Sequence, residues 1–226
     1  MFFNKSEEIV AFKFFAIGKE QEGINRPALV GSLLELFESD FGELPKEFVI
    51  HGPYGISKGQ HIGIRAFKNK LKLKGHEKYY ALSGKTDSKL GFEALFEANI
   101  TNGTYSEVVV WFNPTQFSSS LVEIANHVQT YFPISSGFEI DIDLKKQLIS
   151  ENKIKKGFLG GVSVEISYEH KQWIIDFQSG AFRKELNRLL LNDLQLKQAQ
   201  QHSPEIQSVK VGNLNYVEYG VEQRQA

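Results

Sequence analysis

The 226-residue sequence contains no cysteine, which excludes disulfide scaffolds, thiolate zinc sites and cysteine nucleophiles. It also contains no apolar run close to the roughly 18 residues that a membrane-spanning helix requires. The N-terminus carries acidic residues early and lacks the apolar stretch of a signal peptide. We therefore expect a cytoplasmic protein that makes no contact with a membrane.

An excess of basic residues is also absent. Lysine and arginine together number 26 and aspartate and glutamate 27, so the formal net charge is -1. Phosphate neutralisation supplies most of the affinity of proteins for nucleic acid, and nucleic acid is therefore not expected as the main ligand. The 18 phenylalanines against a single methionine predict a core rich in aromatic rings.

Sequence motifs for catalysis are missing. Gly84-Lys85-Thr86 matches the end of a phosphate-binding loop, but that loop needs a glycine where Tyr79 stands. The sequence also lacks the Gly-x-Ser-x-Gly turn of serine hydrolases. We predict a protein that is not an enzyme and holds no cofactor, with an enzyme whose site follows no known motif as an alternative.

The six histidines do not show the paired helical spacing of a zinc protease. Three of them, His51, His61 and His76, flank one predicted turn region, and the sequence leaves open whether they converge. Histidines at strand ends near loops are mostly plain surface residues. No metal site is therefore predicted.

Hydrophobic periodicity and turn signals together predict an α+β fold. Three local patterns are the clearest: Asn25 with Pro27 as a helix start, Asn102-Gly103 as a hairpin turn, and Ser120 with Glu123 as a capping box. Strands are predicted over residues 9–17, 47–51, 61–67, 68–74, 92–100, 105–112, 138–143, 162–168, 171–177, 206–211 and 214–221, with a short one around Tyr79. Helices are predicted over 25–41, 120–132 and 181–200, and 144–156 is a polar segment for which a helix is one interpretation.

A strand pair followed by a helix occurs twice in this assignment, over residues 92–132 and 162–200. The tight hairpins favour a mixed, largely antiparallel sheet with helices packed on one face. One domain spanning residues 1–226 is expected, and similar lobes over 1–144 and 157–226 are the variant that the repeated pattern allows.

The strand after residue 137 carries a row of carboxylates, Glu139, Asp141 and Asp143, which alternate with apolar residues. Such a row suits a solvated sheet face, a contact with a basic partner, or less readily a cation site. Three further residues complete the predicted partner-binding set: Glu38 and Asp40 on the first helix, and Tyr54 in the turn that follows the second strand.

Lysines at alternate positions from Lys68 to Lys74, close to Tyr79 and Tyr80, form the main basic patch. Basic residues beside aromatic rings suit single-stranded nucleic acid, whereas the intervening leucines favour a half-buried strand. A nucleic-acid-associated or phage-defence accessory module is therefore kept as an alternative function.

Three segments resemble bacterial immunity proteins, which neutralise polymorphic or secretion-delivered toxins. They are the opening strand Ile9-Val10-Ala11-Phe12-Lys13-Phe14, the helix around Leu33-Leu34-Glu35-Leu36-Phe37, and the stretch Tyr131-Phe132-Pro133-Ile134-Ser135-Ser136-Gly137-Phe138. The resemblance implies a non-enzymatic, stoichiometric inhibitor that covers the active site of a cognate toxin. Charge complementarity would then speed the association and select the partner.

Overall fold

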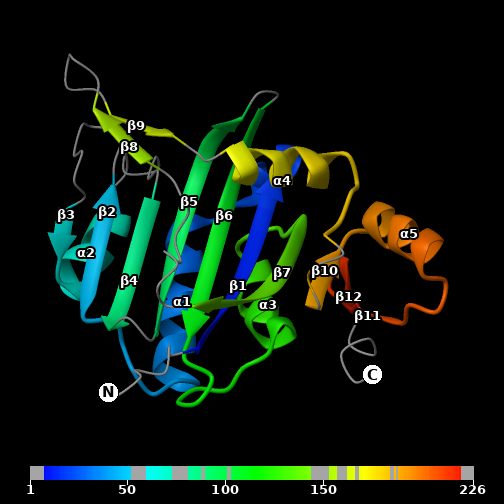
Figure 1. The fold of residues 1–226 in the computed structure, drawn as a ribbon. Coiled ribbons are helices and arrows are strands. Elements are labelled where there is room, and N and C mark those ends of the chain that lie inside the picture. The colour runs from blue at the N-terminus through cyan, green and yellow to red at the C-terminus, as the bar shows by residue number, and fades with distance from the viewer. Residues whose placement is uncertain are drawn as a thin grey trace, which may run out of the picture.

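The computed structural model describes residues 8–51, 60–72, 81–87, 90–100, 103–143, 153–156, 162–165, 168–183, 186 and 188–219. Its main feature is a ten-stranded open sheet in the order β11-β12-β10-β7-β1-β6-β5-β4-β2-β3, in which the neighbouring strands pair antiparallel (Figure 1). The α+β class is confirmed. The strands are β1 Glu8–Ile17, β2 Glu47–His51, β3 Gln60–Ile62, β4 Ala81–Asp87, β5 Leu90–Ile100, β6 Gly103–Phe112, β7 Ser136–Asp143, β8 Lys153–Lys156, β9 Val162–Glu165, β10 Arg188–Leu191, β11 Ser208–Val211 and β12 Leu214–Glu218.

Helices cover both faces of the sheet, and not one face as predicted. The helices are α1 Arg26–Ser39, α2 Ile64–Lys72, α3 Leu121–Gln129, α4 Tyr168–Gln178 and α5 Asp193–His202, with a 3-10 turn over Gly18–Gly23. Buried side chains of α1, α2 and α3 share one core with alternate residues of the central strands, and we call this side of the sheet the first face. Helix α4 packs against the opposite side, the second face, through Ile174 and Phe177 (Figure 1). The division into lobes stays a prediction.

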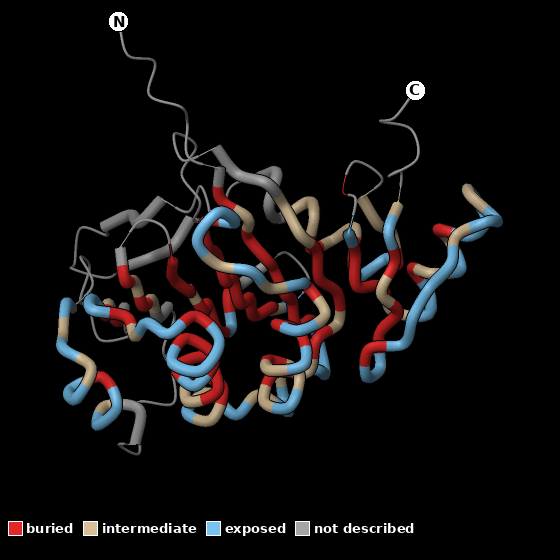
Figure 2. The backbone as a smooth tube through the Cα atoms, turned by 90° about the horizontal axis from the view of Figure 1, so that it is seen from below, coloured by how far each residue is buried: buried red, intermediate tan, exposed pale blue. Residues whose placement is uncertain are grey.

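Strand β1 lies near the middle of the sheet, between β6 and β7. Its residues are buried on both faces, as the nearly continuous apolar run predicts. Phe12 and Phe14 belong to the core of the first face, whereas Phe15 packs against Phe138 and Phe177 on the second. Figure 2 shows the buried positions gathered along the centre of the molecule and the exposed ones along its margins.

The hairpin of β5 and β6 is confirmed, but the turn predicted at Asn102-Gly103 is misplaced, because Gly103 pairs with Ile100 as the first residue of β6. Its register shifts between Leu95 and Ala98, and Glu97 there adopts a left-handed φ of 52°. This bulge adds a residue to β5, so Ala98 joins the core of the second face instead of following Phe92, Ala94 and Phe96 into the first. The strand predicted over 92–100 is therefore present, but a bulge interrupts the alternation of its side chains.

The predicted starts of the first two long helices are confirmed. Asn25 caps α1 by accepting a hydrogen bond from the backbone N–H of Ala28. Ser120 and Glu123 form both hydrogen bonds of a capping box at the start of α3. The inward faces of both helices are fully buried, including Phe37 on α1 and Ile124 on α3.

The strands predicted over 61–67 and 68–74 are wrong, because β3 ends at Ile62 and α2 spans most of the remaining segment. Ile64 and Phe67 stand three residues apart on one side of α2, and Phe67 packs on Phe48 with ring centroids 4.4 Å apart. The alternating lysines are typical of a strand, so the helical spacing of Ile64 and Phe67 was not recognised in the sequence. The short strand expected around Tyr79 lies outside the described residues, and β4 begins at Ala81.

The assignment over 162–200 is also largely wrong. Residues 171–177 belong to helix α4, whose Ile174 and Phe177 recur at helical spacing. The predicted long helix is divided into strand β10 and helix α5. Asn192 and Gln195 form a capping box that starts α5, a signal which the sequence interpretation missed. Residues 153–156 form strand β8, paired with β9, and not a helix.

Candidate functional site

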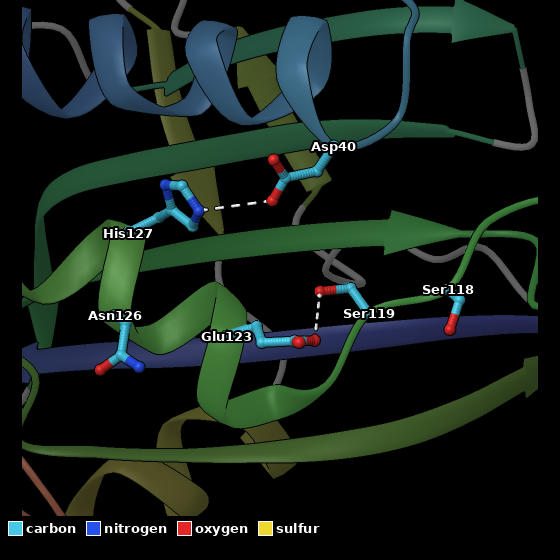
Figure 3. A pocket seen from close by; sticks show the side chains of 6 residues that line it. All are labelled: Asp40, Ser118, Ser119, Glu123, Asn126 and His127. Atoms are coloured by element: carbon cyan, nitrogen blue, oxygen red, sulfur yellow. Dashed lines mark hydrogen bonds and ion pairs between the residues drawn. The ribbon is translucent and has the colours of Figure 1, made fainter.

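A surface pocket of about 490 Å³ lies where the end of α1 meets the beginning of α3. Figure 3 shows its side chains, which come from the residue that follows α1, the loop before α3 and the outer side of α3. All six carry polar groups. The lining residues are Asp40, Ser118, Ser119, Glu123, Asn126 and His127.

Glu123 owes its position to the capping box. Its Oε2 atom accepts hydrogen bonds from the backbone N–H of Ser120 at 2.7 Å and from the hydroxyl of Ser119 at 3.2 Å. These bonds to the charged form, those of Ser120 above all, lower the pKa of Glu123 although the Asp40 carboxylate opposes them. Glu123 therefore stays ionised at neutral and mildly acidic pH.

Asp40 is the second carboxylate of the pocket. It follows α1 as its C-terminal cap residue, and one of its oxygens, Oδ2, lies 3.4 Å from Nε2 of His127 (Figure 3). The two side chains are 40% and 37% exposed, so both remain accessible to a ligand. The backbone carbonyl of His127 accepts a hydrogen bond from the Ser32 hydroxyl, which ties α3 to the middle of α1.

The chemistry of the pocket is that of a polar, acidic recess. In the described part of the chain, the Ser119 hydroxyl donates to Glu123, and no hydrogen bond joins Ser118 or Ser119 to His127. The pocket therefore lacks the serine–histidine contact from which a nucleophile is activated. Two carboxylates with a carboxamide beside them are suited to binding a cationic group that donates hydrogen bonds.

The predicted acidic row lies on β7, next to β1. Glu139 is in register with Phe12, and its side chain, 13% exposed, forms an ion pair with Arg188 at the start of β10. Asp141 and Asp143 are described as strand backbone, in register with residues 10 and 8, and their side chains lie outside the described part. The structure thus places Glu139 in an intramolecular contact and does not bring it into the pocket.

The other predicted residues are dispersed. Glu38 is exposed on α1, two residues before Asp40, and does not line the pocket. Tyr54, His76 and the His51 side chain lie outside the described residues, and His61 is exposed on β3. Within the described ranges, no group of three histidine, aspartate or glutamate residues is placed to hold a metal ion.

A group of four charged residues on the second face, which we call the central charged cluster, was not foreseen. Lys13 on β1 and Glu107 on β6 form an ion pair of 3.3 Å, with side chains 8% and 5% exposed. Glu93 on β5 and Lys85 on β4 complete the cluster across the neighbouring strands. The only signal in the sequence was a lysine within the apolar run of residues 9–17.

Glu93 is the most perturbed member of this cluster. Burial, reinforced by the charge of Glu107, raises its pKa to about 7 against the opposing influence of Lys13 and Lys85. Its Oε2 atom is shielded from solvent and has no hydrogen-bond partner in the described part of the structure. The same is true of Nε1 of Trp111, whose ring lies beneath the Lys85 amine.

Comparisons with known proteins identify no family. No family model matches the chain, and none of the curated proteins matches it. Among solved structures, the chain is similar to the Pseudomonas aeruginosa T6SS protein PA0821, with a TM-score of 0.52 and 8% identity over 93% of this chain and 68% of that one. At this identity the likeness shows a shared fold and nothing about activity. In the described residues, no helix has the length and apolar character needed to span a membrane.

Proposed function

We propose that this chain is a non-enzymatic protein-binding inhibitor of the immunity type, which neutralises a bacterial toxin by covering its active site. The observation that carries the proposal is the acidic pocket between α1 and α3, with its two carboxylates, Asp40 and Glu123. The proposed occupant of the pocket is a lysine or arginine side chain of the toxin. The bound cation would lie between the carboxylates, and the Asn126 side chain offers a further hydrogen bond.

Three features support this reading. The ionised Glu123 is fixed by its cap, so little side-chain entropy is lost when a cation binds. Glu38 and Glu43 are exposed close to Asp40 in the sequence and extend the negative charge around the end of α1. The structural neighbour is described as a T6SS protein, and such a setting fits a partner that is a secretion-delivered toxin.

The proposal is tested by capturing partners from an extract of the native cells on the immobilised protein, followed by mass spectrometry. The wild type should retain a protein that Asp40→Lys does not retain, because the lysine would repel the incoming cation. Glu35→Lys is the matched control, since Glu35 is exposed on the same helix outside the pocket. Equal capture by the wild type and Asp40→Lys would argue against the pocket, and a captured protein that is not inhibited by the chain would argue against inhibition.

Helix α2 provides one observation in favour of a nucleic-acid-associated function. Its Arg65 and Lys68 side chains are exposed, whereas Phe67 is buried and holds the helix against the sheet. The helix therefore presents basic side chains to solvent in a fixed position. The net charge of -1 opposes this alternative, because a nucleic-acid-binding surface usually dominates the charge of the domain.

A further inference from the structure

Among the strands that the structure describes, β11 forms one edge of the ten-stranded sheet and pairs with β12 alone. Its first three residues, Ser208, Val209 and Lys210, are exposed. The side chain of Val209 is unusually open for an apolar residue, at 65%, and only Leu194, at 54%, is comparable among the large hydrophobic residues described. An open strand edge that also exposes an apolar side chain is a template for pairing with another strand.

The turn that follows β11 shows which backbone groups of the edge face outward. Gly212 has a φ of 58°, and it occupies the first central position of a two-residue turn, as a type II′ hairpin requires. The flanking residues Val211 and Leu214 are then the hydrogen-bonded pair. By alternation, Val209 also bonds to β12, whereas Ser208 and Lys210 direct their N–H and C=O groups away from the sheet.

We propose that β11 pairs antiparallel with β11 of a second copy of this chain, across a two-fold axis that passes by Val209. In this arrangement Ser208 of each copy lies opposite Lys210 of the other, and the outward backbone groups of both residues are satisfied. The two Val209 side chains face each other at a non-hydrogen-bonded position, where cross-strand side chains approach most closely. The exposed valine is thereby buried against its own copy.

The charges and the facing side chains favour this register over the two neighbouring registers of the same strand pair. Pairing Lys210 with Lys210 would place like charges opposite each other, and pairing Ser208 with Ser208 would set Val209 against Gln207. In the proposed register the lysines are offset. The amine of Lys210 is also 2.9 Å from the Asp193 carboxylate of its own chain, so the edge carries little net charge. The net charge of -1 for the whole chain adds little repulsion between copies.

The size of the contact determines how strong the dimer is. Strand β11 has four residues, so its pairing adds about four backbone hydrogen bonds and one apolar side-chain pair. Interfaces below about 1,200 Å² belong to weak or transient complexes. The dimer therefore forms and dissociates with concentration.

Sedimentation equilibrium over a concentration series tests the proposal. The average mass of the wild type should rise from 25.7 kDa towards twice that value at high concentration. Val209→Lys should remain at the monomer mass, whereas Leu194→Lys, which alters the other exposed apolar residue, should associate as the wild type does. A wild type that stays monomeric up to about 1 mM, a range typical of weak complexes, would overturn the proposal. Unchanged association of Val209→Lys would overturn it equally.

The absence of native cysteine permits a second test of the register. Val209→Cys introduces one thiol per chain, and a facing non-hydrogen-bonded pair brings the two Cβ atoms to within about 4.5 Å, close enough for a disulfide. Under mild oxidation this variant should form a covalent dimer at least about tenfold faster than Leu194→Cys. Equal rates for the two variants would mean that the Val209 positions of two copies do not face each other, and the proposed pairing would be wrong.

Discussion

Replacement of Glu93 by glutamine should make the protein more stable at alkaline pH. The Glu93 carboxyl, whose Oε2 atom is shielded from solvent, has a pKa of about 7 in the folded chain against 4.5 for an ordinary glutamate. The folded state therefore binds the proton more tightly than the unfolded state, and the free energy of unfolding falls as pH rises from below 4.5 through 7. At about 1.4 kcal/mol per pKa unit, the full loss above pH 8 is about 3 kcal/mol.

Glutamine resembles the protonated carboxyl in shape and carries no charge. The Glu93→Gln variant should thus match the wild type within about 1 kcal/mol at pH 4.5 and exceed it by about 2–3 kcal/mol at pH 8. Urea denaturation followed by tryptophan fluorescence measures this difference, since Trp111 is buried beside the cluster. The comparison should be made at several values between pH 4.5 and pH 8.

Glu35→Gln is the control for this experiment, because Glu35 is exposed on α1 and should show no pH-dependent difference from the wild type. The reasoning would be refuted if Glu93→Gln and the wild type lost stability in parallel between pH 5 and pH 8. A variant less stable than the wild type at pH 8 would also refute it, since ionised Glu93 would then contribute favourably through Lys13 and Lys85.

Three further predictions concern other charged residues. Glu139→Arg should lower the free energy of unfolding by about 1 kcal/mol, because it places two cations together. Adding Arg188→Glu to this variant should restore part of the lost stability in a double-mutant cycle, and an effect of Arg188→Glu that is independent of residue 139 would refute the ion pair. Glu123→Gln should cost at most about 1 kcal/mol at pH 7, because solvent screens this exposed carboxylate. The cost should shrink as the pH falls below 4.5, since the lowered pKa of Glu123 gives stability that is lost when the wild-type carboxylate becomes protonated, and a cost independent of pH in urea titrations would contradict the charged cap. Single-stranded nucleic acid should bind weakly in a gel shift at physiological salt, and sub-micromolar binding that Arg65→Glu with Lys68→Glu removes would favour the alternative function.

Local signals in the sequence predicted those elements that local chemistry determines. The caps at Asn25 and Ser120 and the hairpin between β5 and β6 appear in the structure, because each depends on residues close together in the sequence, although Gly103 is the first residue of β6 and not a central turn residue. The segments over 61–72 and 162–200 were misassigned because lysines or polar residues interrupt their apolar pattern. There the packing of Phe67 on Phe48, or of Phe177 on Phe15, decides the structure.

The candidate site was predicted only in part, for the same reason. Asp40 belongs to the predicted partner-binding set, which stays a prediction, and the sequence indicates Glu123 only as half of a capping box. Their meeting with His127 depends on the packing of α1 against α3, which joins residues 87 positions apart in the case of the Asp40–His127 pair. The central charged cluster likewise depends on the order β1-β6-β5-β4, and strand order is not encoded in the periodicity of a single strand.

The central claim is that the acidic pocket receives a basic side chain of a protein partner. The most direct measurement is the association rate of the captured partner with the wild type, Asp40→Lys and the control Glu35→Lys at low and high ionic strength. Charge reversal in the pocket should slow association by about tenfold or more at low salt, with a smaller difference at high salt, while the control changes little. Association of Asp40→Lys at the wild-type rate at both ionic strengths, with dissociation also unchanged, would contradict the claim.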